Sequence, residues 1–281
     1  MARVLWTALL FNLLVATGKL LYGAWSGALS VTADGFHSLL DAASSIVGLV
    51  GIQMARRPPD EDHHYGHQKF EILSAMGISL LLFLSAYEIV VEAFGRMDRD
   101  VLPVHSPWGY ALLGATLLIN SLVFRMEQVR GKELSSPLLL ADAEHTRSDI
   151  LATIGVLGSL VSIQMGTRWI DLFVALAIGV IIARAGYRII GRAVTVLTDS
   201  AAIDATAIEE VLAGFPGALH AHKIRSRGFE DQIFIDLHMH VEPEMSLREA
   251  HDLSERIEKA LQQRFRGVTD VVIHVEPHGE H

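Results

Sequence analysis

Two nine-residue stretches that lie far apart in the chain carry the same pattern. Residues 33–41 read ADGFHSLLD and residues 141–149 read ADAEHTRSD, so both follow A-D-x-x-H-x-x-x-D. Each stretch sets ionisable side chains three and four residues apart in an apolar run, where they share one face of an α-helix. Ionisable residues are costly inside a bilayer and mark functional sites there. The pattern therefore predicts two membrane helices, each with a polar stripe facing a bundle interior.

Six segments of the chain are long and apolar enough to cross a membrane. A bilayer core of about 30 Å takes about 20 helical residues. The first apolar run continues too long and lacks an A-x-A-like end, so it is interpreted as a span and not as a cleavable signal peptide. The predicted spans are Val4–Gly23, Leu29–Met54, Phe70–Phe94, Trp108–Phe124, Leu138–Gln164 and Ile170–Ile190.

Positive charge is unevenly divided between the two sides of these predicted spans. Short loops rich in Lys and Arg remain on the cytoplasmic side of a membrane. The richer side holds Arg3, Arg56, Arg57, Lys69, Arg125, Arg130, Lys132, Arg188 and Arg192, and the other side holds Arg96, Arg99 and Arg168. We therefore expect a multi-pass protein of the cell inner membrane with both termini in the cytoplasm.

The chain changes character after Asp199, which predicts two domains, 1–199 and 200–281. The second part holds 15 Asp and Glu against 8 Lys and Arg, whereas the first part holds 17 against 15. Its hydrophobic pattern predicts the order helix, strand, strand, helix, strand, typical of an α+β domain with one three-stranded sheet. The predicted elements are Ala205–Ala213, Ala221–Arg227, Gln232–Val241, Ser246–Arg264 and Val271–Val275.

Composition excludes several classes of function. Hydrophobic residues make up 51% of the chain, more than in a typical soluble domain. There is no cysteine, so any metal site would depend on His and carboxylate side chains and not on thiolates. The formal net charge of −9 argues against nucleic acid as a partner.

The repeated pattern predicts an intramembrane metal site. His37 and Asp41 on one helix and His145 and Asp149 on the other would lie near the middle of their spans. Together they offer two imidazoles and two carboxylates, a tetrahedral ligand set suited to Zn²⁺. The preceding residues of each stripe, Asp34 and Asp142, fit proton-handling or ligand-supporting roles better than ligation.

A second cluster of His and acidic residues lies in the predicted cytoplasmic loop between the second and third spans. The spacing D-x-x-H-x-x-x-H can close on one ion if the loop runs into a helix. The cluster consists of Asp60, His63, His64 and His67.

A third cluster lies on the predicted C-terminal strands. His238 and His240 alternate with Met239, so both point to one face of a strand. His274 and Glu276 do the same on the last strand, and imidazoles on adjacent strands converge. The full set is His220, His222, His238, His240, His251, His274 and Glu276, followed by His278 and His281 in an expected loose tail.

Taken together, these patterns resemble the cation diffusion facilitator family of zinc-transporter-type secondary transporters. The resemblance covers nearly the whole chain, from the paired H-x-x-x-D motifs to the LTDS stretch at residues 197–200 and IHVEP at residues 273–277. It implies a six-helix domain in the lipid bilayer, a cytoplasmic metallochaperone-like (ferredoxin-like) domain and a homodimer. The implied activity is not enzymatic. It is alternating-access export of Zn²⁺ from the cytoplasm in exchange for protons.

The same resemblance assigns three metal sites and a cargo. Branches that prefer iron or manganese replace the residue at the position of His37, so the histidine here favours zinc, with Fe²⁺, Cd²⁺ or Mn²⁺ as the alternative. The implied sites are His37, Asp41, His145 and Asp149 for transport; Asp60, His63 and His67 in the loop; and His222, His240, His251, His274 and Glu276 for regulation by bound Zn²⁺, with His238 as the alternative to His240.

Two other classes of protein fit the sequence less well. Residues 62–67, DHHYGH, resemble one histidine box of a membrane di-iron desaturase, but the remaining histidines do not form the further boxes that this chemistry needs. The H-E-x-x-H motif of zinc proteases is absent. A metal sensor or storage protein that does not transport stays open as a third interpretation.

Overall fold

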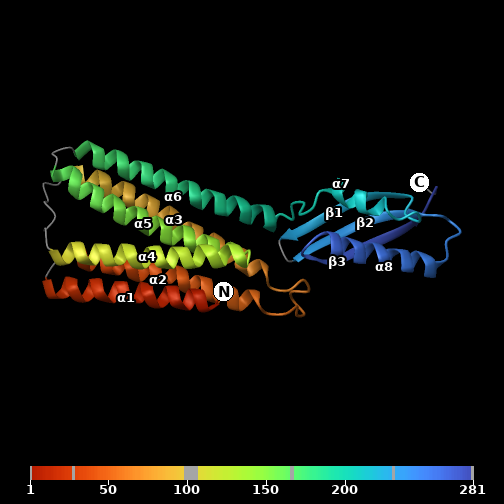
Figure 1. The fold of residues 1–281 in the computed structure, drawn as a ribbon, viewed down its shortest axis with the longest axis horizontal. Helices are drawn as coiled ribbons and strands as arrows, with labels where there is room; N and C mark the ends of the chain where they lie inside the picture. The colour runs from red at the N-terminus through yellow and green to blue at the C-terminus, as the bar shows by residue number, and fades with distance from the viewer. Residues whose placement is uncertain (1, 27–28, 98–106, 165–167, 230–231, 280–281) are drawn as a thin grey trace. The chain divides into compact units, whose positions relative to one another are not determined.

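In the computed structural model, six long helices form the first part of the chain (Figure 1). The structure describes residues 2–26, 29–97, 107–164, 168–229 and 232–279. The helices are α1 (Ala2–Ser26), α2 (Leu29–Ala55), α3 (Lys69–Met97), α4 (Pro107–Glu133), α5 (Pro137–Gln164) and α6 (Arg168–Leu197). Consecutive helices run in opposite directions, so α2 and α5 are antiparallel.

Three of these helices are apolar enough over their length to cross a membrane by composition alone. They contain the segments Arg3–Tyr22, Lys69–Gly95 and Leu172–Leu197. Among the described residues of α2, the segment Ala42–Ala55 is apolar but shorter than these three. A count of six spans therefore stays a prediction for α2, α4 and α5.

Small residues let the helices of the bundle approach closely. A side chain at Gly48 would meet Leu5 of α1 at 3.1 Å, and one at Gly51 would collide with Ser74 of α3. Leu138 of α5 lies beside both glycines. Such close approach is how membrane helices gain packing energy without a hydrophobic effect between them. The helix α2 is therefore held between α1, α3 and α5.

The C-terminal part, from Val194 to His281, is a separate compact unit. Its elements are α7 (Ala205–Leu212), β1 (His220–Phe229), β2 (Gln232–Val241), α8 (Leu247–Arg264) and β3 (Val268–Pro277). The sheet has the order β1-β2-β3, with β1 and β2 antiparallel and β2 and β3 parallel. The predicted element order is confirmed, although β1 and β3 each extend one to three residues beyond the predicted strands at both ends.

One face of this sheet packs against the two helices. The odd-numbered residues of β2, from Ile233 to Val241, are buried with Leu253, Ile257 and Leu261 of α8. The helix α8 begins with a capping box, in which Ser246 and Glu249 exchange side-chain to backbone hydrogen bonds. The even-numbered residues of β2 face the other way, and these include both histidines of the strand.

Candidate metal centres

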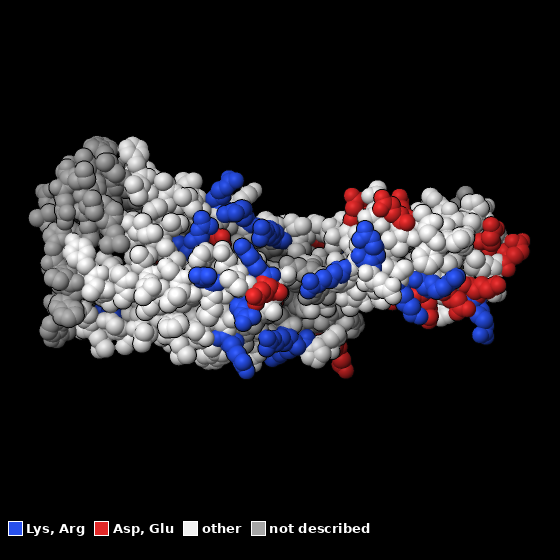
Figure 2. Space-filling view, in the orientation of Figure 1, with Lys and Arg blue, Asp and Glu red and all other residues white. Residues whose placement is uncertain are grey.

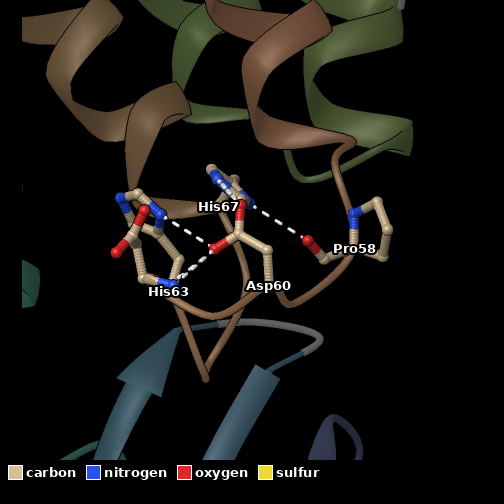
Figure 3. Close-up of polar contacts among 5 residues, drawn as sticks. Pro58, Asp60, His63 and His67 are labelled. Carbon is tan, nitrogen blue, oxygen red and sulfur yellow. Dashed lines mark hydrogen bonds and ion pairs between the residues drawn. The ribbon is translucent and has the colours of Figure 1, made fainter.

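The loop that joins α2 to α3 folds into a compact turn around the carboxylate of Asp60 (Figure 3). Its Oδ1 atom accepts hydrogen bonds from the backbone N–H groups of Asp62 at 3.1 Å and His63 at 2.7 Å. Gly66 adopts φ of 81°, a conformation that glycine takes readily, and donates its N–H to the carbonyl of His63 at 2.9 Å. The turn thereby returns His67 to Asp60 just before α3 begins.

His63 and His67 both approach this carboxylate. Nδ1 of His63 lies 3.2 Å from Oδ1 of Asp60, and Nε2 of His67 lies 3.3 Å from Oδ2. The three residues offer ligand atoms that all lie within 4.8 Å of one another. Asp60 and His63 face solvent, whereas His67 is 3% exposed. The predicted loop site is thus brought together, and His64, which is exposed, lies outside the group of three.

The hydrogen bonding of His67 fits a metal ligand. Its Nδ1 lies 3.2 Å from the carbonyl oxygen of Pro58, which can only accept, so we assign the hydrogen to Nδ1. In the neutral ring Nε2 then carries a lone pair directed at the Asp60 oxygen. A proton or a metal ion between these two atoms, which lie 3.3 Å apart, would be attracted by both. A backbone carbonyl on the second nitrogen is the usual support of a metal-bound histidine.

The charge of Asp60 is held by the turn. Partial desolvation raises the pKa of this carboxyl. Hydrogen bonds from the backbone N–H and the ring of His63, and from the N–H of Asp62, together have the larger and opposite effect, so the pKa lies below its usual value. The group is therefore ionised at neutral pH and available to a cation without first losing a proton.

The second centre covers the face of the C-terminal sheet opposite α7 and α8. The strand register sets His222, His238 and His274 side by side in one row and His220, His240 and Glu276 in the next. The register of β1 against β2 shifts between His222 and Arg225, where Lys223 has φ of 50°, so the regular rows of histidines on β1 stop at His222. Alternation on three adjacent strands thus gathers six metal-binding side chains on one surface.

Glu276 is the hub of this surface. One of its oxygens lies 2.7 Å from Nδ1 of His238, and the other lies 3.1 Å from Nε2 of His240 and 3.4 Å from Nε2 of His222. The hydrogen bond from His238 is the main cause that lowers the pKa of Glu276 to about 2, against the opposing effect of desolvation. An anion is therefore fixed at the centre of the histidines.

Three residues of this surface fit a metal ion best. His222, His238 and Glu276 offer ligand atoms within 4.8 Å of one another. Desolvation lowers the pKa of His222, which favours the neutral ring that a metal needs. Its buried Nδ1 has no hydrogen-bond partner in the part of the chain that the structure describes. Two imidazoles and a carboxylate form a Zn²⁺ ligand set with a fourth position open.

The other predicted ligands of this domain differ in position. His274 joins the surface, with its ring centroid 4.6 Å from that of His238. His251 lies apart from this surface within the single chain, because α8 packs on the opposite face of the sheet, and its assignment as a ligand stays a prediction. Its side chain is 69% exposed beside Glu255. The expected loose tail is wrong for His278, whose N–H bonds to Val241 at 2.9 Å and whose ring meets His240; His281 lies outside the described residues.

The intramembrane site is described on one of its two helices. His145 is 4% exposed on α5, and Asp149 lies one turn further along the same helix, partly buried. The side chains of His37 and Asp41 lie outside those that the structure describes, although both positions belong to α2. The predicted four-residue set is therefore complete only in its backbone positions.

Contacts between α2 and α5 fix the register of the two helices. A side-chain hydrogen bond joins Ser44 of α2 to Asp142 of α5, and Gly48 lies beside Leu138. The helices are antiparallel, so a step toward the N-terminus of α2 matches an equal step toward the C-terminus of α5. From the Ser44–Asp142 contact, position 41 is level with position 145, and position 37 is level with position 149.

Glu276→Gln should weaken Zn²⁺ binding by the C-terminal domain at least tenfold, because it removes the carboxylate around which the histidines gather. Isothermal titration of residues 200–281 with Zn²⁺ measures the loss. Asp270→Asn, an exposed change on the same strand, is the matched control and should bind as the unchanged domain does.

A second measurement on Glu276→Gln uses pH. A carboxyl whose pKa falls on folding stabilises the fold above its unfolded value of 4.5, and this contribution disappears as pH falls toward about 2. The melting temperature of the metal-free variant should therefore lie below that of the unchanged domain at neutral pH. The difference between the two melting temperatures should disappear as pH falls from 4.5 toward about 2. A gap that stays constant with pH would contradict the role given to Glu276.

Comparison with known proteins defines the class of protein. Residues 5–198 match the model of the cation efflux transmembrane domain, and residues 201–278 match the model of the cation efflux protein cytoplasmic domain. The chain is therefore a membrane transporter of divalent metal cations that acts in efflux, and it is not an enzyme. It belongs to the cation diffusion facilitator family.

Similar proteins cover almost the full chain. An uncharacterised transporter of Methanocaldococcus jannaschii is 31% identical over 94% of both chains. The cation-efflux pump FieF of Yersinia pestis is 32% identical, covering 90% of this chain and 86% of its own. The manganese efflux system protein MneP of Bacillus subtilis is 27% identical over 99% of this chain and 96% of its own. A solved cytosolic domain of a cation diffusion facilitator family protein is 36% identical, covering 27% of this chain and 89% of its own, with a TM-score of 0.25.

Proposed function

We propose that this transporter exports Zn²⁺ from the cytoplasm in exchange for protons, by alternating access at His37, Asp41, His145 and Asp149. The register of α2 and α5 is the observation that carries this proposal. It sets position 41 level with His145 and position 37 level with Asp149, so each level of the helix pair holds one histidine and one aspartate. Two such levels, one helical turn apart, support a four-ligand N2O2 site.

The ligand types favour zinc over harder cations. Imidazole suits Zn²⁺, whereas sites made only of carboxylates and carbonyls suit Mn²⁺ and other hard ions. Similar proteins include a manganese efflux system protein and the cation-efflux pump FieF, so Mn²⁺, Fe²⁺ and Cd²⁺ are the competing cargoes. The two histidines at His37 and His145 are the reason to place zinc first.

The topology proposed for this function has both termini in the cytoplasm of a cell with an inner membrane. On the face drawn in Figure 2, the described Lys and Arg side chains of the helical unit gather at the end where α2 is joined to α3. The excess of positive charge in short loops favours the cytoplasmic side for this end. The loop site of Asp60, His63 and His67 would then meet cytoplasmic metal.

The C-terminal domain has a regulatory role in this proposal. We take it as residues 200–281, after a membrane domain of residues 1–199, and infer that it joins two chains in a homodimer. Its surface of His222, His238, His240, His274 and Glu276 would bind Zn²⁺ when the metal is abundant in the cytoplasm, and His251 would contribute only from outside this surface.

His37→Asp should shift cargo preference toward harder ions. The change replaces one imidazole with a carboxylate, which lowers the preference for Zn²⁺ relative to Mn²⁺. Flux of both ions into proteoliposomes, measured separately at one pH, gives the ratio. A Zn²⁺ to Mn²⁺ ratio equal to that of the unchanged protein would show that His37 does not set selectivity.

Transport itself is tested against the alternative of a metal sensor or storage protein. Purified protein in liposomes should move Zn²⁺ across the bilayer until the gradients balance, with many ions moved for each protein molecule. A sensor or store would take up only as many ions as it has sites, so metal uptake that stops at this stoichiometry would overturn the proposal.

A further inference from the structure

Glu127 of α4 and Asp142 of α5 are buried against each other in the helical unit. Glu127 is 0% exposed and Asp142 is 1% exposed. A side-chain hydrogen bond joins the two carboxyl groups. A carboxylate can only accept hydrogen bonds, so a bond between two carboxyl groups requires that one of them carries a proton.

Among the described residues, two hydroxyl groups bond to the pair. Thr146 donates its hydroxyl to Oε2 of Glu127 at 2.8 Å, and Ser44 of α2 is hydrogen-bonded to Asp142. The remaining oxygens, Oε1 of Glu127 and Oδ2 of Asp142, are buried and meet no N–H or hydroxyl donor among the described residues. Two ionised carboxylates in contact and away from water would repel each other strongly.

We propose that Glu127 and Asp142 share one proton and form a proton site separate from the metal ligands, and that metal binding at His145 and Asp149 expels this proton. The first half of this inference stands on the pair alone. The second half rests on the proposed transport site.

The position of the pair explains how a metal ion would act on it. Asp142 precedes His145 by three residues on α5. Among the described residues outside the pair, His145 acts electrostatically on Asp142, and Asp149 acts electrostatically on Glu127. Among its described side chains, α2 contributes the uncharged Ser44. Asp149 lies seven residues beyond Asp142, about 10 Å along the helix. A dication bound there favours the ionised form of nearby carboxyls, whereas an empty site does not.

The proton balance of this step is simple. When the metal binds, the O–H bond of the protonated carboxyl breaks and the proton passes to water. The pair is left with two negative charges, and this ionised form is favoured by the two positive charges that the metal adds to the nearby site. When the metal leaves, one proton returns. The pair thus binds a proton in the metal-free carrier and loses it in the loaded carrier, which is the relation that antiport requires.

A proton fits between these groups better than a second metal ion. One oxygen of Glu127 already accepts from Thr146, so only two oxygens remain without a donor. Hard divalent cations take about six oxygen ligands, many of them from water, and both side chains are closed to solvent. A proton needs only the two facing oxygens.

Infrared spectroscopy of the full-length, metal-free protein tests whether the proton is there. The C=O stretch of a protonated carboxyl should be present at pH 7.5 and should be lost both in Glu127→Gln and in Asp142→Asn, because each variant leaves a single carboxylate with an amide partner. Glu133→Gln, an exposed change on the same helix, should keep the band. A band that is absent from the unchanged protein, or equally strong in both variants, would overturn the shared proton.

Proton release on metal binding tests the coupling. A pH dye in weakly buffered detergent solution reports the protons released for each Zn²⁺ bound. Glu127→Gln should release about one proton fewer than the unchanged protein and Glu133→Gln. Equal release in all three would overturn the coupling. If Glu127→Gln binds one Zn²⁺ ion fewer per protein chain and keeps the infrared band unchanged, the pair is a metal site and the proton site is refuted.

These results separate the pair from the transport proposal. A protein that carries the infrared band but shows no pH-dependent Zn²⁺ flux retains the shared proton and loses the antiport mechanism. If Zn²⁺ flux depends on pH but the infrared band is absent, only the shared proton is refuted and the antiport proposal stands.

Discussion

Asp149→Ala is expected to abolish metal transport. The change removes one of four proposed ligands and one of the two carboxylates that balance the charge of the ion, so the site loses both a metal bond and part of its electrostatic attraction for Zn²⁺. Loss of a group that only supports a ligand lowers metal affinity about 10- to 100-fold, and loss of the ligand itself should cost more. Zn²⁺ flux in proteoliposomes should therefore fall to the level of protein-free liposomes. Asp41→Ala should have the same effect through the partner helix.

The controls for this result keep the helix intact. Glu144→Gln changes a carboxylate of α5 that pairs with Arg147 and should leave flux unchanged. Asp149→Asn keeps the volume of the side chain and should fail as Asp149→Ala does, because an amide is a poor Zn²⁺ ligand. Zn²⁺ flux close to that of the unchanged protein in both Asp149 variants, with a folded protein by gel filtration, would refute the site.

A pH gradient should determine how fast the protein exports Zn²⁺. An imidazole binds a metal only in its neutral form, so protons and Zn²⁺ compete for His37 and His145. Metal affinity at this site should therefore fall steadily as pH drops from about 7.5 to about 5.5. An outer side more acidic than the cytoplasm would therefore release Zn²⁺ outside and allow its rebinding inside.

Two recordings on the same proteoliposomes check this coupling. Zn²⁺ flux should accelerate when the compartment that receives Zn²⁺ is made more acidic, and the pH of the vesicle interior should change as the metal moves. Flux that ignores the gradient, without any internal pH change, would identify a uniporter or channel.

Periodic sequence signals predicted most of the fold. The A-D-x-x-H-x-x-x-D repeat located α2 and α5, and alternation around Met239 predicted the histidine face of β2. The family models confirm the division into a cation efflux membrane part and a cytoplasmic part. These features follow from local periods of 3.6 and 2.0 residues, which a single sequence displays directly.

Features that depend on contacts between elements were not visible in the sequence. Nothing in the pattern around Glu127 indicates that it meets Asp142 across two helices. The resemblance assigned His251 to the regulatory site, and the sequence could not show that α8 places it on the other side of the sheet from the histidine surface of the same chain. The role of His278 escaped prediction because its place depends on the backbone bond to Val241 that extends the sheet edge.

The antiparallel register of α2 and α5 restricts how the carrier can open. If α2 slid past α5 by one turn, about 5.4 Å, position 41 would come level with position 149 and two aspartates would face each other, while position 37 would lose its partner. The Ser44 to Asp142 contact would also break. In the proposed alternating-access cycle, α2 and α5 would therefore move together, and access to the metal would change through movement of the helices around them.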